Sequence, residues 1–184
     1  MVNSDKDPTD GAGDGQLLER AAAGDTASFD ALMNRHCQRF MRLAYSLVGD
    51  QAAAEDVVQE TFLAAFSGMR SFRREASVRT WLVSILVRLA AKHRRREWLR
   101  RHAPLQEVEA RPGADPANRS DARMDLAWAL NGLDEHHRRV IVLREIEGLS
   151  YEEISRVLAV PRGTVESRLY RARAALREKL GGDY

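Results

Sequence analysis

The chain lacks the residues that would mark a disulfide-bonded or metal-binding protein. Among 184 residues there is one cysteine, Cys37, so no disulfide can form within the chain. With no second thiol and no His-x-x-His cluster, we expect no metal site. Cys37 is predicted to be a small, partly buried apolar residue.

No segment has the pattern of a membrane span or of a secretion signal. Every apolar run is shorter than the roughly 18 residues that a membrane-spanning helix needs. Residues 1–15 include four Asp and three Gly, which is the composition of a disordered tail. We therefore expect a cytoplasmic protein with no membrane insertion and a disordered tail over residues 1–15.

The sequence also lacks a recognisable catalytic arrangement. There is no Ser/His/Asp or Cys/His set, no phosphate-binding glycine loop and no carboxylate pair. The glycines at 11, 13 and 15 follow no strand pattern and lie in the predicted tail. We therefore expect no enzymatic activity and no cofactor.

Charged residues are abundant and unevenly distributed, although the formal net charge is only +2. Residues 70–103 carry eleven basic and two acidic side chains, and residues 136–184 carry ten and seven. Residues 1–69 are net acidic. Two separate basic blocks predict two contacts with a polyanion. A scaffold that binds only proteins would leave both blocks unexplained.

Residues 148–180 have the local signals of a helix-turn-helix. Ser150 and Glu153 form a capping box that starts a short helix at Tyr151, and Pro161 allows a longer helix to begin. The longer helix has an apolar face made of Val165, Leu169, Ala172 and Leu176. Its opposite face is polar and rich in arginine, which suits a helix in the major groove. On the pattern alone, a solvated basic face remains the alternative.

Helical periodicity covers most of the remaining chain. It places Phe66 on the inner side of the helix that starts at Gln51, and it places Val140, Leu143 and Ile146 on the inner face of a helix that Asp134 can cap. The helix predicted from Gln51 to about Gly68 has an outer face whose periodicity alone would indicate a solvated acidic surface. Residues 71–79 are predicted to form a loop, and the next helix has Trp81 on its buried side. Residues 102–121 contain three of the five prolines and no helical rhythm. We expect an all-α fold with two small helical domains, 16–101 and 122–181, joined by a flexible linker over 102–121.

Two phrases in the chain resemble a known family. GLSYEEISRVLAVPRGTVESRLYRARAAL is similar to region 4 of bacterial RNA polymerase sigma factors of the extracytoplasmic-function (ECF, group IV) class, and AEDVVQETF is similar to their region 2. The resemblance implies a sigma factor that directs promoter recognition, DNA melting and transcription initiation. The implied partners are core RNA polymerase, through its β' clamp helices and β flap, promoter DNA, and an anti-sigma factor.

The resemblance also implies three groups of functional residues. The core-polymerase contacts would be Asp56, Gln59, Glu60 and Leu63. The minus-ten element would be melted and captured by Phe72, Ser77, Ser84, Arg88, Lys92 and Arg95. The minus-thirty-five element would be contacted by Arg162, Thr164, Glu166, Ser167, Arg168, Tyr170, Arg171 and Arg173.

Three positions depart from the family pattern. Arg88 and Lys92 stand where the family has Asn and Asp, which favours phosphate contact and removes hydrogen-bonding groups near the bases. Glu166 stands where relatives often have Lys or Arg, and a carboxylate can accept from cytosine N4. We therefore expect a changed preference at one base pair of the minus-thirty-five element.

The alternative function is a stand-alone helix-turn-helix regulator that binds DNA without polymerase. Its first domain would be a dimerisation or signal-receiving module, and the helix at residues 51–68 would need an apolar exposed face. A sigma factor needs Gln59 and Glu60 exposed on that helix instead.

Overall fold

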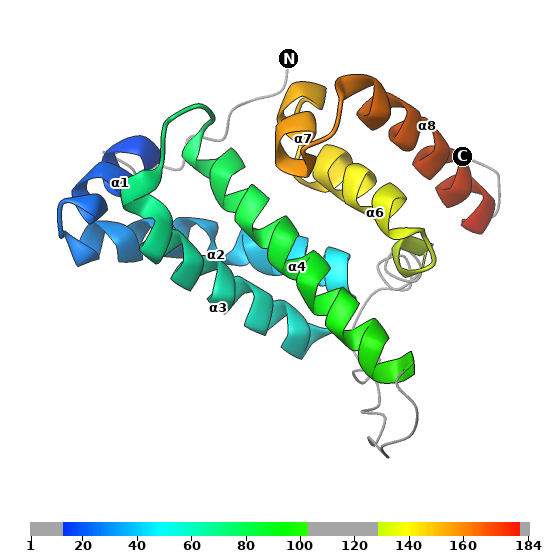
Figure 1. Ribbon diagram of the computed structural model, residues 1–184, viewed down its shortest axis with the longest axis horizontal. Helices are drawn as coiled ribbons and strands as arrows, with labels where there is room; N and C mark the ends of the chain where they lie inside the picture. The colour runs from blue at the N-terminus through cyan, green and yellow to red at the C-terminus, as the bar shows by residue number, and fades with distance from the viewer. Residues whose placement is uncertain (1–12, 103–128, 181–184) are drawn as a thin grey trace.

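The computed structural model describes residues 13–102 and 129–180, and within these ranges it contains helices and loops but no strand. Figure 1 shows α4 crossing the middle of the molecule, with α1 and α3 on one side, α6 to α8 on the other, and α2 passing behind α4. The predicted all-α class is confirmed. The helices are α1 (Asp14–Ala22), α2 (Thr26–Val48), α3 (Gln51–Gly68), η1 (Met69–Ser71), α4 (Val78–His102), α6 (Glu135–Ile141), η2 (Val142–Ile146), α7 (Tyr151–Leu158) and α8 (Arg162–Lys179).

Residues 1–12, 103–128 and 181–184 lie outside the described residues, and with them most of the predicted tail and linker. The edges of those predictions differ from the structure. Asp14 and Gly15 begin α1 instead of ending the tail, and α4 continues to His102, which was assigned to the linker. None of the described helices combines the length and the apolar composition that a membrane span needs.

Short polar caps set the ends of the first-domain helices. The Asp25 carboxylate accepts from the Ser28 N–H at 3.2 Å, and the Asp50 carboxylate accepts from the Ala53 N–H at 2.8 Å. Gly49 ends α2 with φ +80°, which a side chain rarely adopts, and a Cβ there would lie 2.6 Å from Asn131 Oδ1. A glycine is therefore needed where the end of α2 meets the second half of the chain.

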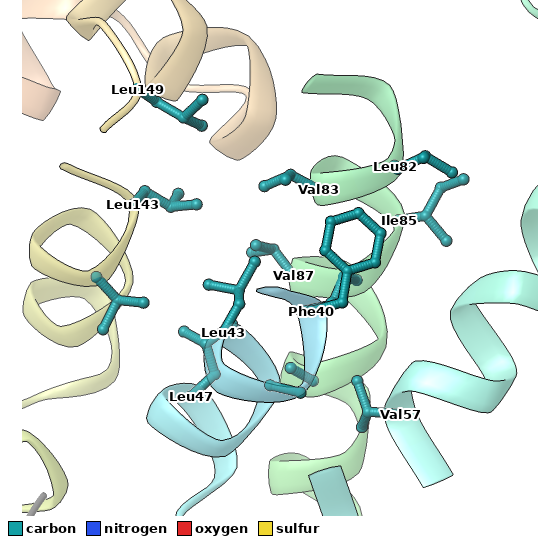
Figure 2. Packing of buried hydrophobic residues seen from close by; sticks show 14 of the residues in the cluster. Phe40, Leu43, Leu47, Val57, Leu82, Val83, Ile85, Val87, Leu143 and Leu149 are labelled. Atoms are coloured by element: carbon teal, nitrogen blue, oxygen red, sulfur yellow. The ribbon is translucent and has the colours of Figure 1, made fainter. Parts of the chain in front are cut away.

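The buried apolar side chains form one continuous cluster across both helical groups. Figure 2 shows Leu143 and Leu149, from the second group, facing Leu43 and Val83 of the first. Leu143 is fully buried and Leu149 is 1% exposed. Contacts join α4 to α7 and α2 to η2. The two predicted domains therefore pack directly against each other in this structure.

One inward-facing prediction in the second group is wrong. Ile146, placed on the buried face with Val140 and Leu143, is 38% exposed. Residues Val142–Ile146 form a π-helical turn, in which the Glu147 N–H bonds to the Val142 carbonyl at 3.1 Å. The wider i to i+5 turn breaks the 3.6-residue rhythm, so Ile146 rotates outward and Glu147 inward.

Three further predictions in the first group need correction. Cys37 is exposed, because it lies on the outer side of α2, between the buried His36 and the half-buried Arg39. Phe66, assigned to the inner face of α3, is 46% exposed, although its ring meets Phe29 edge-on at 5.1 Å. The segment 71–79 is only partly a loop, because η1 includes Ser71 and α4 starts at Val78.

Candidate nucleic-acid interface

The capping box and turn predicted for residues 150–162 are confirmed. The Ser150 N–H donates to the Glu153 carboxylate at 2.8 Å, and the Glu153 N–H donates to Ser150 Oγ at 3.2 Å. Ala159 then turns the chain in the left-handed conformation, φ +52°, and α8 begins at Arg162 directly after Pro161. These local signals fix α7 and α8 as a helix-turn-helix.

The two faces of α8 differ as predicted. Val165, Leu169 and Ala172 are buried against the rest of the second group, and Leu176, predicted with them, is half-buried. The opposite face is exposed, and Tyr170 has the highest exposed fraction among its large apolar side chains, 78%. The residues predicted to contact the minus-thirty-five element are exposed or half-buried on α8: Arg162, Thr164, Glu166, Ser167, Arg168, Tyr170, Arg171 and Arg173.

Two arginines on the exposed face of α8 are already paired with carboxylates. Arg162 donates to Glu166 at 2.9 Å and to Glu152, on α7, at 2.5 Å. The hydrogen bond to Glu166 and the nearby Glu152 charge raise the pKa of the Arg162 guanidinium. Arg173 donates to Glu145 at 2.7 Å. A ligand that takes either guanidinium must displace a carboxylate.

The loop between η1 and α4, residues 72–77, forms the second candidate surface. The Phe72 ring lies 5.0 Å from the Trp81 ring, and both side chains are half-buried, so Trp81 belongs only partly to the core. Ser77 Oγ accepts from the Thr80 N–H at 3.1 Å and so caps the start of α4. Ser84 donates to the Trp81 carbonyl at 2.7 Å. The two predicted serines therefore also have local structural roles.

A basic row continues from this loop along α4. Arg88, Lys92 and Arg95 are exposed and follow one another at spacings of four and three residues, so they lie on one face of the helix. The loop precedes α4 and this row lies in the middle and second half of the same helix, so both belong to the first domain.

The outer face of α3 is the third candidate surface. Asp56, Gln59 and Glu60 are exposed, and Leu63 is 69% exposed. The opposite side of α3 packs on α2 and α4. This face is polar with one projecting leucine, and it is not the apolar face that a dimeric regulator would need.

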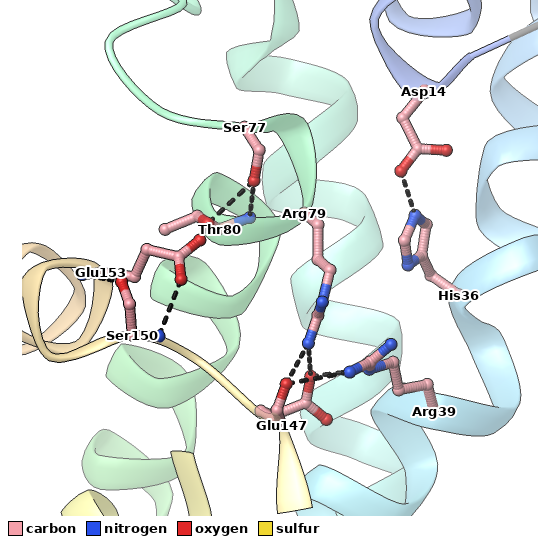
Figure 3. A network of polar contacts seen from close by, with 9 residues as sticks. All are labelled: Asp14, His36, Arg39, Ser77, Arg79, Thr80, Glu147, Ser150 and Glu153. Carbon is pink, nitrogen blue, oxygen red and sulfur yellow. Dashed lines mark hydrogen bonds and ion pairs between the residues drawn. The ribbon is translucent and has the colours of Figure 1, made fainter. Parts of the chain in front are cut away.

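Sequence reasoning missed a polar network between the two helical groups. Glu147 is 1% exposed, and its carboxylate accepts from Arg39 Nε at 2.7 Å and from Arg79 Nη2 at 3.3 Å. The Glu147 carbonyl accepts from the same two guanidiniums, from Arg39 at 3.0 Å. Figure 3 shows both arginines converging on Glu147. No sequence signal distinguishes this glutamate from the exposed ones around it.

The first turn of α7 adds contacts to the same boundary. Thr80 donates to Glu153 at 3.1 Å, and Arg156 donates to the Glu75 carbonyl at 3.4 Å. Burial raises the pKa of Glu153, but the hydrogen bonds from Ser150 and Thr80 hold it below its usual value. A cavity of about 360 Å³ at this boundary is lined by Phe72, Trp81 and Ser84 from the first group and by Arg156 and Val157 from α7.

No cluster of three His, Cys, Asp or Glu side chains with the arrangement of metal ligands occurs within residues 13–102 and 129–180. What the surfaces offer is charge and hydrogen bonding, in two cationic patches and one polar-acidic helix face. Such surfaces bind nucleic acid and protein partners.

Comparison with known proteins gives consistent matches along the chain. The sigma-70 region 2 family matches residues 32–100, and the sigma-70 region 4 family matches residues 123–176. The ECF RNA polymerase sigma factor SigE of Mycolicibacterium smegmatis is 40% identical over 168 residues, which span 86% of this chain and 65% of that protein. The RNA polymerase sigma-H factor of Pseudomonas aeruginosa is 33% identical over 91% of this chain and 93% of its own length.

Solved structures of similar proteins agree with these matches. CnrH, in complex with the cytosolic domain of CnrY, has a TM-score of 0.69 and 31% identity, covering 91% of this chain and 97% of its own. The sigma factor RpoE, in complex with the anti-sigma factor NepR from Bartonella quintana, has a TM-score of 0.68 and 28% identity, covering 85% and 98%.

Proposed function

The chain belongs to the ECF RNA polymerase sigma factors, and we propose that it binds core polymerase and directs it to promoters that it helps to melt. In this proposal α3 contacts polymerase, the loop 72–77 with α4 captures the minus-ten element, and α8 contacts the minus-thirty-five element. The protein would act in the cytoplasm as a specificity factor without catalytic activity of its own.

The outer face of α3 is the observation that supports a polymerase-dependent factor most directly. Asp56, Gln59 and Glu60 are exposed beside Leu63, which projects from the helix. A polar-acidic face with one apolar anchor suits docking onto a basic partner surface. A stand-alone regulator would use this helix for dimerisation and would need an apolar face there.

Replacing the two central side chains of this face is expected to weaken polymerase binding. In run-off transcription with purified core polymerase, Gln59→Ala/Glu60→Ala should lower the yield about 10-fold at limiting protein. Each truncation removes roughly 0.7 kcal/mol of interface contacts, and 1.4 kcal/mol corresponds to a factor of 10. Thermal unfolding should be unchanged, because neither side chain is buried.

Asp30→Ala/Gln38→Ala is the matched control, since it removes one acid and one amide from exposed positions of α2. It should transcribe like the unaltered protein. Equal run-off yields from both double variants would mean that the outer face of α3 does not contact polymerase.

The loop 72–77 and α4 have the features needed to hold a single strand. Aromatic rings can stack on bases, and a cationic helix face can follow the phosphates. Phe72 and Trp81 supply the rings, while Arg88, Lys92 and Arg95 supply the charges. We assign minus-ten capture to this surface, with Ser77 and Ser84 positioning the loop and the helix.

The paired arginine on α8 sharpens the expectation for the minus-thirty-five element. Glu166 holds Arg162 at 2.9 Å, so Glu166→Lys both removes a carboxylate near the bases and leaves Arg162 paired with Glu152 alone. We expect the preferred base to change at one position, by about 10-fold in relative promoter strength. Selection from a randomised promoter library would reveal the change, and an unaltered preferred sequence would contradict it.

An anti-sigma factor is the expected regulator. Among the similar proteins of known structure, RpoE was solved bound to the anti-sigma factor NepR, and CnrH was solved bound to the cytosolic domain of CnrY. By family resemblance we extend control by an anti-sigma factor to the present chain. The β flap of polymerase is the proposed partner of the second domain.

A further inference from the structure

Arg39 and Arg79 form a cationic cradle on the first domain. Arg39 comes from α2 and Arg79 from the first turn of α4, and both guanidiniums turn toward the same carboxylate, that of Glu147 (Figure 3). Their side chains are 37% and 30% exposed, whereas the carboxylate between them is 1% exposed. Two guanidiniums around one anion are the arrangement with which proteins bind a phosphate.

The hydrogen bonding between Glu147 and the cradle is incomplete. Glu147 Oε1 and Arg79 Nε are buried and have no hydrogen-bond partner among the described residues. A buried unpaired acceptor and donor each cost free energy that water or another ligand would recover. The contact between the two domains therefore leaves one carboxylate oxygen of Glu147 without a hydrogen bond.

The cradle adjoins the proposed minus-ten surface. Arg79 is two residues from Ser77 and lines a cavity of about 550 Å³, whose lining also includes Arg70, Phe72 and the ion pair of Arg74 with Glu19. A strand held by the loop 72–77 would therefore pass close to the Arg79 guanidinium. The first domain thus places an additional cation beside the single DNA strand that we propose this loop holds.

We propose that Arg79, with Arg39, is a further promoter-phosphate site and that Glu147 of the second domain occupies it as an internal anion until the domains separate. This inference rests on the proposed function, which supplies the phosphate. Glu147 and a DNA phosphate cannot both fill the cradle, so the closed molecule competes with promoter DNA for these two arginines.

Promoter geometry requires the separation. The minus-ten and minus-thirty-five elements lie roughly 25 base pairs apart, or about 85 Å at 3.4 Å per pair. In the closed molecule α7 contacts α4, and Thr80 is bonded to Glu153 at 3.1 Å. The two domains must come apart to contact both elements, and that movement withdraws Glu147 from the cradle.

Two substitutions on opposite sides of the contact test the assignment. Both Glu147→Gln and Arg79→Gln weaken the contact between the domains, but only Glu147→Gln leaves the cradle intact. In the full chain, Glu147→Gln should bind a fluorescein-labelled, mixed-sequence single strand of about 16 nucleotides roughly 3- to 10-fold more tightly. Its salt dependence should steepen by about 0.7 for each phosphate engaged. Arg79→Gln should bind no more tightly than the unaltered protein.

Opening is measured separately by energy transfer. Cys37 is exposed and is the only cysteine of the chain, so a label there and at Glu178→Cys on α8 reports the distance between the domains. Both substitutions should lower the transfer efficiency. Glu135→Gln, which removes a carboxylate paired within α6, and Arg42→Gln, an exposed arginine of α2, are the controls and should change neither measurement.

Equal strand binding by Glu147→Gln and Arg79→Gln would overturn the phosphate site, because Arg79 would then only join the domains. Unchanged strand binding by Glu147→Gln would overturn it as well. None of these measurements contains polymerase. Their failure would therefore not contradict the run-off prediction for Gln59→Ala/Glu60→Ala, and failure of the run-off prediction would not contradict them.

Discussion

Replacing Arg138 by Met is expected to lower the free energy of unfolding by about 3 kcal/mol. The Arg138 side chain is 2% exposed, and its guanidinium donates to backbone carbonyls. Leu130 accepts from Nε at 2.7 Å, and Asn131 and Leu133 accept from Nη2 at 2.6 and 3.0 Å. The carbonyls at the end of a helix lack partners within the helix and attract positive charge.

The same guanidinium also reaches the other domain. Arg138 Nη1 donates at 3.2 Å to the Leu47 carbonyl, near the end of α2, to which Arg94 also donates at 3.1 Å. A methionine would fill much of the space of the aliphatic stem but would leave buried acceptors without this donor. The substitution should therefore destabilise both the fold of the second domain and its contact with the first.

Arg139→Met is the control for this prediction, because it removes the neighbouring arginine. Arg139 is paired with Glu135, one turn earlier on α6, and such a pair stabilises a protein by about 0.5 kcal/mol. Urea unfolding followed by circular dichroism should therefore separate the two variants clearly. Coincident unfolding curves would show that the buried guanidinium does not stabilise the fold.

The contrast between these two arginines shows where sequence analysis reaches its limit. The helix-turn-helix was predictable because its determinants are local: Ser150 and Glu153 are three residues apart, and Pro161 marks the next helix start. Glu147 is paired with Arg39, 108 residues away in the chain, and one of the hydrogen bonds of Arg138 reaches Leu47, 91 residues away. Charged residues are mostly exposed, so helical periodicity assigns both to the surface.

The π-helical turn explains why helical periodicity assigns both Ile146 and Glu147 to the wrong side. A regular helix would continue the inward face of Val140 and Leu143 to Ile146 and would turn Glu147 outward. The additional residue in the turn reverses both, exposing Ile146 and burying Glu147. Nothing in the residues VLREI distinguishes this turn from an α-helical one.

The surface positions were predicted more accurately than the core contacts. Gln59, Glu60 and Leu63 are exposed, as the period of α3 requires, and the polar residues of α8 lie on its outer side. Their roles in binding stay predictions, since the periodicity fixes only which way a side chain faces. The packing of the two domains could not be predicted either, because it depends on buried surfaces from both.

The largest functional effect is expected from Arg88 and Lys92, the two positions of α4 that depart from the family pattern. Arg88→Gln/Lys92→Gln should lower promoter opening by holoenzyme about 100-fold. Two charge-assisted contacts with phosphates at about 1.5 kcal/mol each supply roughly 3 kcal/mol, and 1.4 kcal/mol corresponds to a factor of 10. Both side chains are exposed on α4, so thermal stability should stay the same.

Salt dependence identifies the cause of that loss. Each contact with a single-stranded phosphate contributes about 0.7 to the magnitude of the slope of log affinity against log salt. The slope of the double variant should therefore be smaller in magnitude by about 1.4. Permanganate reactivity of unpaired thymines measures opening over a salt series. Arg20→Gln/Arg42→Gln, which removes two exposed arginines from α1 and α2, should alter neither the extent of opening nor the slope by as much.

A second pair of substitutions separates phosphate contact from base contact. Arg88→Asn/Lys92→Asp introduces the residues of the family pattern, which offer hydrogen bonds to bases but no positive charge. If Arg88 and Lys92 hold phosphates, this variant should lose the same salt slope as the glutamine variant while gaining a preference among minus-ten sequences. A glutamine variant that opens promoters normally would show that the cationic row of α4 does not hold the melted strand.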